Sequence, residues 1–594
     1  MPQATLGVSA ASKPVAPGKF QDTTLDRWSF NKRGLALRNE GMLWYPTWME
    51  IAANENPTRG FFYEKRPNVG EKINHKTLLN SVAEDDFDTL ANGMISGLTS
   101  PSRPWFKPAI DDADLMEYTP VKEWLDKVAA IMFDIYARSN IYGSLYTIYN
   151  EVASFGTACA LMEEDYRDIV RMRAYTIGEY YLGCNQAGRV NAFYRRFWMT
   201  AAQIIEKFGK GNVTPATLQS FMNQAPDTWN VVNHLIEEND DRIDKYKDFQ
   251  NMPFRSIYWQ DGAQPMSYLK LGGYEEFPIL APRWATTTTA DFYGKGPGWK
   301  ALGDSKMAQK LESDLLIAIA KSIRPPLQAD ASVQGDPNVA PDGVTRSSSL
   351  VPNAGVRAVY QVQLDLNAVI NKIAKTEASI HRKTFADLFK MMLDAERTGQ
   401  PVTAEQIIEE KNEKMSMLGP VLEHLETELL DPMNEREFNI AWRMGLIPPP
   451  PKEIQGMPLK MKYTSVLAQA QRMMGIQVID EWVVGVGNLA EASQDPSCWD
   501  VVNKDEVSLD KADRLGVPAK LVNDEPTMAA TRKARQQIQE QQQKIQAADA
   551  AASIAQKASG AAKNLATSPV GPQGENGGAS ALDGILKGMQ GGGQ

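Results

Sequence analysis

The chain has 594 residues, of which 43% are hydrophobic, and this length and composition allow several domains with cores of their own. Its 63 basic and 73 acidic side chains give a net charge of −10, with a pI near 5.3. A chain this acidic is not typical of a general nucleic-acid binder, because such proteins neutralise phosphates with clustered lysine and arginine. The charge does not exclude a surface past which DNA slides without adhering.

The cysteines and histidines are isolated from one another. Cys159, Cys184 and Cys498 lie far apart, so the sequence predicts reduced thiols and neither a disulfide framework nor a metal cluster. The N-terminus has no basic region followed by an apolar core, so no secretory signal is expected. The most apolar short run, 315–320, is too short to span a bilayer. We expect a soluble protein made in a reducing cytoplasm, without a cofactor.

The first half of the chain is predicted to be a domain of helices followed by strands. Residues 1–24 are rich in Ala, Ser, Pro and Gly and are expected to form a flexible arm, and residues 25–293 the domain itself. Helical patterns occupy 25–54, 77–98, 121–139 and 142–162, and short helices are expected around 201–208 and 216–223. Strand patterns occupy 169–175, 179–182, 189–198, 254–260, 266–271 and 278–282. This order predicts an α+β fold with a mainly antiparallel sheet.

Two further helical patterns flank a segment that has little core of its own. Apolar residues recur at helical spacing up to residue 323, where Arg324-Pro325-Pro326 ends the pattern because proline has no amide donor. The segment 324–364 has few large apolar side chains and many glycines and prolines. A second helix is predicted over 365–393. The helical patterns over 301–323 and 366–392 are each about 35–40 Å long. With the helices assigned to 294–323 and 365–393, they predict a stalk that carries a projecting module.

The chain behind the stalk is predicted to be mainly helical. A polar loop at 394–402 precedes a helix from Thr403 that is expected to kink at Gly419-Pro420 and to end before Gly445. More helices are expected at 465–474, 478–491 and 511–515, all within the segment 403–529. A last helix over 530–560 has a heptad spacing of small and polar residues. Residues 561–594 are rich in glycine and are expected to be disordered.

No complete catalytic motif is present. The loop GKGPGWK at 294–300 lacks the Gly-Lys-Ser/Thr ending with which a nucleotide P-loop holds phosphate and magnesium, so it is interpreted as a flexible entry to the stalk. Acidic pairs at 85–86, 111–112 and 240–241 could suggest a two-metal nuclease, but adjacent residues do not share a helix face. We therefore expect no enzyme and no catalytic or metal-binding residues.

Basic residues lie on the second stalk helix and in the loop behind it. One interpretation is a solvated helix face, or ion pairs with neighbouring helices. The other is a sparse ring of positive charge that faces a polyanion once symmetry multiplies each side chain. The residues concerned are Lys372, Lys375, Arg382, Lys383, Lys390 and Arg397.

Several short stretches follow one another along the chain. They are GLTSPSRPWF at 97–106, YNEVASFG at 149–156, YGKGPG at 293–298, ALGD at 301–304, RPPL at 324–327, LGP at 418–420, ELLDP at 428–432, PPPP at 448–451 and SVLAQAQ at 465–471. In this order they resemble the portal, or head-to-tail connector, proteins of short-tailed bacteriophages. The similarity covers roughly residues 25–530, and the order of the stretches carries it rather than any single motif.

The resemblance implies a portal fold, assembled as a ring of twelve subunits around a DNA channel at one capsid vertex. Residues 25–293, with part of 394–529, would form the wing. Residues 403–529 would hold a kinked wing helix and the crown region, and 530–560 would be a crown or barrel helix. The helices at 294–323 and 365–393 would form the stem, and 394–402 a tunnel loop. The six basic residues named above would then be candidates for the channel wall.

The resemblance also implies partners. Residues 324–364 would be the clip where tail adaptor proteins dock, and its candidate docking residues are Gln334, Asp336, Asp342, Arg346 and Arg357. The wing would meet the major capsid protein and scaffold, and a packaging terminase would hydrolyse ATP. The expected location is the head-tail junction of the virion, after assembly in the host cytoplasm. Two alternatives remain at this point: a structural tail or scaffold oligomer without a channel, and a DNA-processing enzyme.

Overall fold

The structure is a computed structural model that divides into two compact units, one made of residues 1–507 with 514–516 and the other of 508–513 with 517–594. The residues that it describes are 27–62, 78–112, 115–116, 118–243, 245–246, 248–262, 268–288, 290–338, 343–348, 355–359, 366–389, 418–464, 466–493, 496–514 and 525–567.

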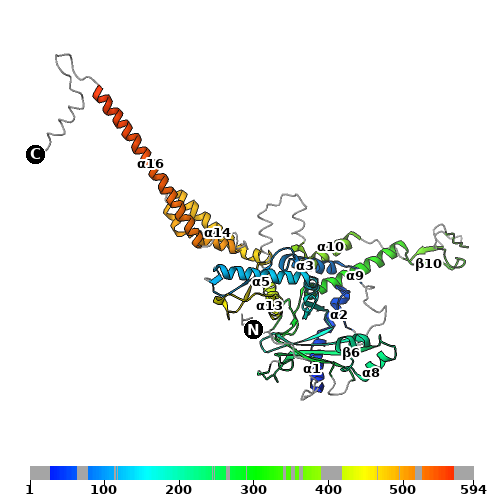
Figure 1. The fold of residues 1–594 in the computed structure, drawn as a ribbon. Helices are drawn as coiled ribbons and strands as arrows, with labels where there is room; N and C mark the ends of the chain where they lie inside the picture. The colour runs from blue at the N-terminus through cyan, green and yellow to red at the C-terminus, as the bar shows by residue number, and fades with distance from the viewer. Residues whose placement is uncertain are drawn as a thin grey trace, which may run out of the picture. The chain divides into compact units, whose positions relative to one another are not determined.

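Helices come first along the chain of the larger unit (Figure 1). They are α1 (Arg27–Met42), α2 (Tyr45–Asn54), α3 (Val82–Leu98), α5 (Thr119–Arg138) and α6 (Ile141–Phe155). Helices α2, α3 and α5 each contact α6 and form a helical layer with it, whereas α1 packs against the larger of the two sheets described below. The single helix predicted over 25–54 is divided into α1 and α2. Pro46 lies in the first turn of α2, where its missing amide donor costs nothing.

Helix α6 ends earlier than the predicted helix over 142–162. Gly156 follows Phe155 with φ 85°, the left-handed conformation that commonly ends a helix. The chain then enters strand β2 at Cys159. The prediction of helix up to residue 162 was therefore wrong, because the apolar run continues across the turn and hides the change of structure.

Two antiparallel sheets follow the helices. The smaller has the strand order β3-β2-β9 and the larger the order β4-β5-β6-β7-β8. The strands are β2 (Cys159–Asp165), β3 (Ile169–Tyr175), β4 (Tyr180–Cys184), β5 (Val190–Thr200), β6 (Trp229–Glu238), β7 (Phe254–Gln260), β8 (Lys270–Tyr274) and β9 (Ile279–Leu280). Two short helices, α7 (Ala201–Phe208) and α8 (Pro215–Met222), connect β5 to β6. The predicted α+β class is confirmed.

Strand β6 lies at the centre of the larger sheet but was missing from the predicted strands. Its buried residues include Asn233 and His234, which are 1% and 2% exposed, so the usual alternation of apolar and polar residues fails. Tyr194 donates a hydrogen bond of 2.8 Å to the amide oxygen of Asn233, and His234 Nε2 lies 2.9 Å from the hydroxyl of Ser256. Neighbouring strands thus satisfy polar groups that made the segment look unlike a strand.

The chain behind residue 418 returns to the helical layer. Strand β1 (Phe106–Ala109) pairs antiparallel with β12 (Lys460–Tyr463), although more than 350 residues separate them in the sequence. The indole of Trp124 donates a hydrogen bond of 2.9 Å to the carbonyl of Pro448, the first residue of the four-proline run. Helices α3, α5 and α6 therefore share one hydrophobic core with this later segment.

The later helices differ in detail from their predictions. Residues 418–443 are helical and contain a π turn, η2 (Glu426–Leu430), before α13 (Asp431–Arg443). Gly445 follows with φ 72°, as predicted, while the loop 394–402 and the helix 403–417 lie outside the described residues. Helix α14 (Val466–Ser493) is continuous where two helices were predicted, since a lone glycine does not break a helix. The remaining elements are η3 (Lys452–Ile454), η4 (Pro496–Val501) and α15 (Lys504–Arg514).

The smaller unit contains one long helix, α16 (Glu525–Thr567), of 43 residues. It exposes Ile538 and Ile545, which are seven residues apart and 56% and 61% exposed. The predicted helix over 530–560 lies within it. Among the residues that the structure describes, no helix of either unit is long and apolar enough to cross a membrane.

Candidate functional site

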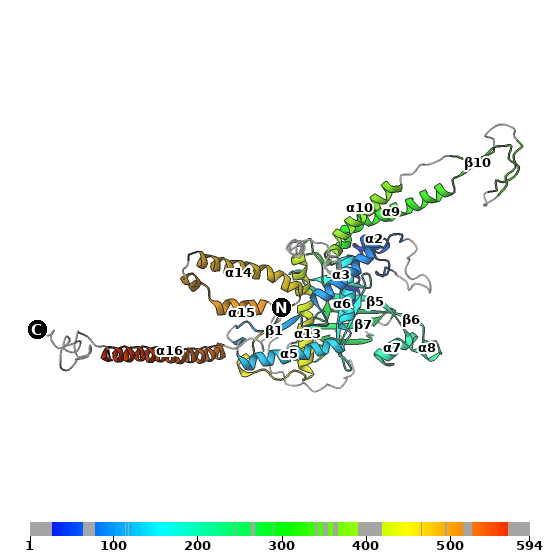
Figure 2. The same ribbon diagram turned by 90° about the horizontal axis from the view of Figure 1, so that it is seen from above.

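An antiparallel pair of helices projects from the larger unit (Figure 2). Helix α9 (Pro297–Ile323) runs outward and α10 (Leu366–Lys383) runs back. Between them, β10 (Leu327–Ala329) pairs antiparallel with β11 (Val356–Ala358) at the far end. We call α9, α10 and this end the arm, and the arm corresponds to the stalk that the sequence predicts.

The loop that leads into α9 is packed tightly at its glycines. A methyl group at Gly298 would lie 2.2 Å from the carbonyl oxygen of Ser154, and one at Gly296 would lie 2.6 Å from that of Val152. These glycines therefore let the loop approach the end of α6 more closely than any side chain allows. The loop is therefore a close-packed entry to α9 rather than the flexible one predicted.

Polar side chains fasten the root of α9 to the helical layer. The hydroxyl of Ser305 donates a hydrogen bond of 2.8 Å to Glu55, whose side chain is buried at the end of α2. The amide of Gln309 donates to the carbonyl of Asn80 at 2.6 Å, and its oxygen accepts the backbone N–H groups of Leu79 and Asn80. Lys306 adds an exposed ion pair of 2.6 Å with Glu50. The inner part of the arm is thus held by directional bonds.

The returning helix is fastened to α9 and to α3. Lys383 Nζ lies 2.7 Å from a carboxylate oxygen of Asp304, and Ser379 donates to the same oxygen at 2.6 Å. Although partial burial acts against it, these bonds lower the pKa of Asp304. His381 Nδ1 lies 2.7 Å from the buried carboxylate of Asp86 on α3. The candidate Lys383 is therefore an ion-pair partner within the arm.

Helix α10 ends before residue 393, where the predicted helix ends. Thr384 turns its hydroxyl to Asp86 at 2.8 Å, and Phe385 follows with φ 60°, a left-handed conformation that interrupts the helix. The ring of Phe385 packs against Trp284 at 5.8 Å between centroids. Helical residues resume at 386–389, and the residues behind them lie outside the described part.

The other basic candidates divide into two groups. Lys372, Lys375 and Arg382 are exposed on α10, and at about 100° of rotation per residue they share one side of the helix with Lys383. Lys390 and Arg397 lie outside the described residues. The structure therefore places four of the six candidates on one helix face and leaves their contact with a polyanion as a prediction.

The candidate docking residues lie at the far end of the arm. Arg357 is on β11 opposite Gln328 of β10, and a second bridge joins Val333 to Ser347. Four of the candidates, Gln334, Asp336, Arg346 and Arg357, are exposed, whereas Asp342 lies outside the described residues. The same end exposes apolar Leu327, Val344 and Val359.

The outer half of the arm exposes apolar side chains that its root does not. The buried residues of α9 are Pro297, Gly298, Ala301, Ser305 and Ala308, all in its first half. Farther out, the exposed apolar residues are Leu316, Ile317 and Ile323 on α9 and Ile370 on α10, which are 54%, 49%, 72% and 53% exposed. The described part of this chain does not cover these side chains.

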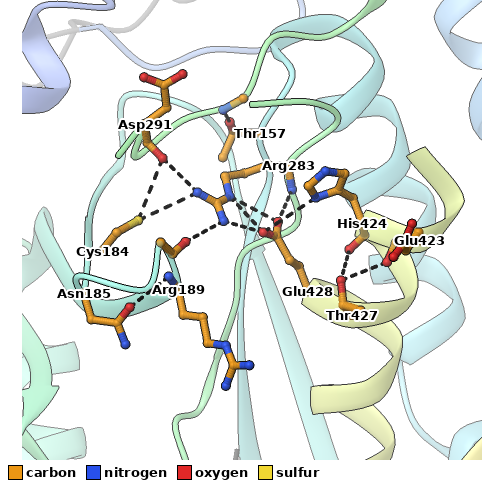
Figure 3. A network of polar contacts seen from close by, with 12 residues as sticks. Thr157, Cys184, Asn185, Arg189, Arg283, Asp291, Glu423, His424, Thr427 and Glu428 are labelled. Atoms are coloured by element: carbon orange, nitrogen blue, oxygen red, sulfur yellow. Dashed lines mark hydrogen bonds and ion pairs between the residues drawn. The ribbon is translucent and has the colours of Figure 1, made fainter. Parts of the chain in front are cut away.

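A buried ion pair behind the arm was missed by the sequence reasoning (Figure 3). Arg283, which precedes the loop to α9, pairs with Glu428 on the π turn η2, and Glu428 also accepts the backbone N–H of Arg283 at 2.9 Å. Although burial acts against it, the bonds and charge of Glu428 raise the pKa of Arg283. The guanidinium also donates to the carbonyls of Asp291 and Gly188, each at 2.8 Å. Glu428 belongs to the ELLDP stretch, but nothing in the sequence indicates a partner 145 residues away.

The acidic pairs do not form a metal site. Asp86 binds His381 and Thr384, Asp111 pairs with Lys460 at 2.7 Å, and Asp241 pairs with Arg255 at 3.2 Å. Within the described ranges, no three His, Cys, Asp or Glu side chains are grouped so that they could hold a metal ion. Their positions are explained by ion pairs and hydrogen bonds.

The family of the chain follows from a match over most of its length. Residues 29–522 match the model of the bacteriophage head to tail connecting proteins. The chain belongs to this family. The connector is similar to the "Probable portal protein" of Bordetella phage BPP-1, with 36% identity over 540 residues that cover 91% of this chain and 94% of the relative. It is 34% identical over 532 residues to the "Portal protein" of Salmonella phage epsilon15, covering 89% and 93%.

These names are those of structural proteins of phage particles and name no catalysed reaction. A solved structure, the neck of an empty gene transfer agent particle, aligns over 74% of this connector and 90% of that chain. Its sequence identity is 11% and its TM-score 0.31, a likeness too weak to support an argument. The resemblance to portal proteins found in the sequence is confirmed by the family and by the two relatives.

We predict that replacing Glu55 with Gln stabilises the connector at pH 8 but not at pH 5. Burial raises the pKa of Glu55 to about 8, with the hydrogen bond from Ser305 acting against the rise. Since an unfolded chain ionises this group near its ordinary pKa of about 4.3, the folded state alone keeps the proton between about pH 5 and 8. The free energy of unfolding should therefore fall with rising pH, by up to about 1.4 kcal/mol per unit.

Urea denaturation at pH 5 and pH 8 measures this effect. Gln is neutral at both values, so the Glu55→Gln variant should lose part of the pH dependence and exceed the wild type at pH 8. Glu50→Gln, which changes an exposed carboxylate near the same root, is the matched control and should behave like the wild type. Equal pH dependence in all three proteins would contradict a buried, protonated Glu55.

Proposed function

We propose that this connector assembles into a ring of twelve subunits at one vertex of the capsid, where it conducts double-stranded DNA during packaging and ejection and holds the tail. The observation that carries the proposal is the exposed apolar outer half of the arm. The family match and the names of the two relatives support a position between head and tail.

A closed ring explains the outer half of the arm because it covers every copy alike. Fully burying a Leu or Ile side chain stabilises by about 1.5–3 kcal/mol, so the half-exposed Leu316, Ile317, Ile323 and Ile370 could contribute several kcal/mol at each contact. In a rotationally symmetric ring, each arm meets the opposite face of the next, and no copy is left with an open face. A monomer would leave the same surface in water.

The parts of the chain receive roles from this arrangement. Residues 25–293, with part of 394–529, would form the wing, and α9 and α10 the stem within 294–323 and 365–393. The far end of the arm, within 324–364, would be the clip. The loop 394–402 would be the tunnel loop, and 530–560 a crown or barrel helix. Residues 1–24 and 561–594 would be terminal extensions outside this core.

Charge would let DNA pass with little adhesion. Twelve copies at −10 each amount to roughly −120, which repels a polyanion over distances near the Debye length. The exposed Lys372, Lys375 and Arg382 would then be isolated positive points along the channel, with Lys390 and Arg397 beyond them. Lys383 would contribute less, because Asp304 neutralises it within the arm.

The proposed partners follow the same division of the chain. Tail adaptor proteins would dock at the clip, where Gln334, Asp336, Arg346 and Arg357 are exposed. The major capsid protein and scaffold would meet the wing, and a packaging terminase would supply the ATP hydrolysis that moves the DNA. The connector would reside at the head-tail junction of the virion after assembly in the host cytoplasm, without enzymatic activity of its own.

Replacing Leu316 and Ile323 with Asp is predicted to abolish rings without unfolding the subunit. Both side chains are exposed within one chain, so charges there should cost little in a monomer but should be excluded from a tight contact between arms. Met222→Asp, at an equally exposed apolar position on α8 in the proposed wing, is the control and should still form rings. Mass photometry measures ring formation, and circular dichroism checks that each variant is folded. Rings of the double Asp variant at wild-type yield would show that the arm is not the contact between subunits.

Replacing Lys372 and Lys375 with Gln is predicted to change DNA retention and leave ring assembly intact. Both lysines are exposed on α10, so their removal alters charge more than packing. Lys127→Gln on α5, an exposed lysine of the proposed wing, serves as the control. In a packaging assay, an unchanged yield and retention of DNA would contradict a contact of these lysines with DNA and would favour a solvated helix face.

Deleting residues 330–350 is predicted to leave rings intact and to abolish tail attachment. The described residues of this segment are exposed or half-exposed, so its loss should not disturb the root of the arm. Electron micrographs of particles assembled with the shortened chain would count tailless heads. Loss of the rings themselves would mean that the segment belongs to the contact between subunits rather than to a docking site.

A further inference from the structure

A hollow of about 420 Å³ lies where the two sheets of the larger unit meet. Strand β3 of the smaller sheet and strands β5, β6 and β7 of the larger sheet contribute to it, together with helix α7. Its volume is within the range of sites that hold small organic molecules. It lies in the proposed wing, outside the arm, and the roles proposed above name none of its lining residues.

Arg195 of β5 is the most enclosed cation in the hollow. Its guanidinium carbon lies 4.2 Å from the ring centre of Tyr175 and 4.3 Å from that of Phe197, so two rings fix its position. The carboxylate of Glu179 lies 3.6 Å away, too far for a hydrogen bond. Its Nε–H is buried and has no hydrogen-bond partner among the described residues. A buried donor without an acceptor is costly and indicates that an acceptor is missing.

Two more cations line the hollow. The ammonium group of Lys207 on α7 lies 4.8 Å from the ring centre of Tyr258, and Arg173 on β3 lies 3.6 Å from Glu163, again beyond hydrogen-bond distance. Glu206 is the one carboxylate among the lining residues that the structure describes. Among the lining residues three cations thus stand beside one carboxylate, while Glu163 and Glu179, which are not lining residues, lie 3.6 Å from Arg173 and Arg195.

The floor of the hollow adds no further charge. His234 stacks on Tyr258 with ring centres 3.7 Å apart, and its Nε2 lies 2.9 Å from the hydroxyl of Ser256. Burial, with the nearby Lys207 and Arg195, holds the pKa of His234 well below its usual range, so the ring is neutral. The positive charges at the lining thus belong to the three cations, two of which are partly balanced by Glu163 and Glu179.

The pKa of Lys207 responds to the same crowding of positive charge. Although part of its side chain is exposed, burial of the ammonium group lowers this pKa to about 8. Glu163 acts against the shift, while Arg173, Lys270 and Arg195 add to it. An anion in the hollow would relieve this repulsion.

We propose that this hollow binds a small phosphate monoester, whose phosphate contacts Arg195, Lys207 and Arg173. At neutral pH such a phosphate carries a charge near −2 and presents three acceptor oxygens, so it can contact all three cations, whereas a carboxylate presents two oxygens. Arginine and lysine both serve as phosphate ligands, and arginine can donate two parallel hydrogen bonds. The unsatisfied Nε–H of Arg195 is one of the donors that the phosphate would use.

The remaining space fits an organic group rather than a phosphate alone. Phe197, Met199 and Leu161 form an apolar part of the lining. The ester should therefore bind more tightly than inorganic phosphate, because its organic group would bury these side chains further. This assignment does not depend on ring formation or on a DNA channel.

Titration calorimetry of the full-length chain with phenyl phosphate, inorganic phosphate and benzyl alcohol tests the proposal. Phenyl phosphate should bind most tightly, phosphate more weakly and the neutral alcohol not measurably. Arg195→Gln and Lys207→Gln should each weaken phenyl phosphate about tenfold or more, the loss expected for one charge-assisted hydrogen bond. Lys210→Gln, an exposed lysine just behind α7 that does not line the hollow, should match the wild type.

A pH series separates a direct contact from a merely structural effect. Phenyl phosphate keeps its charge between pH 7 and 10, whereas Lys207 loses its proton near pH 8, so wild-type affinity should fall over this range. The Lys207→Gln variant should show a flat profile. Thermal unfolding of each variant checks that the fold is kept. If Arg195→Gln unfolds, the affinity of the Arg195→Lys variant, which keeps the charge but lacks the guanidinium, is measured instead.

Three results would overturn the proposal. One is equal affinity in the wild type and in both Gln variants, which would mean adventitious binding to surface charge. Another is equal affinity for phosphate and its phenyl ester, which would remove the organic group. The last is displacement of phenyl phosphate by a 12-base-pair duplex at equal phosphate concentration, which would make the hollow a contact for DNA rather than for a small ester.

Discussion

Apolar side chains on the outer half of the arm are exposed, because no described residue of the same chain packs over them. Leu316, Ile317 and Ile323 on α9 and Ile370 on α10 are each about half exposed or more, while every buried residue of α9 lies in its inner half. An exposed apolar patch is a common feature of a surface that contacts another molecule. Adjacent copies of the same chain in a ring are the simplest way to bury these side chains, since each copy supplies both faces of the contact.

The inner half of the arm has the opposite character, because it is fixed in several directions. Glycines at 296 and 298 allow backbone contact with the end of α6, and Ser305 and Gln309 bond to two different segments of the helical layer. Behind them, Arg283 and Glu428 join the loop before α9 to the π turn η2 (Figure 3). Such a mount would hold each arm at a constant angle, which a closed ring requires of every subunit.

The sequence predicted what depends on local pattern and missed what depends on distant partners. Helical spacing and the stop at Arg324-Pro325-Pro326 placed α9 correctly, and Gly445 ends its helix as expected. Strand β6 was not predicted, because its buried Asn233 and His234 are polar and form hydrogen bonds with neighbouring strands. The helix predicted up to residue 393 is interrupted at Phe385. Among the site candidates, Lys383 could not be recognised as the partner of Asp304, because the two belong to helices that meet only in the fold.

A reconstruction of the purified connector by electron cryomicroscopy tests the central claim most directly. The account predicts closed rings with an open axis, in which Leu316 and Ile323 of each subunit are buried against the arm of the next. Monomers at all concentrations and salt conditions would contradict it. So would rings in which these side chains face solvent and the contacts lie elsewhere.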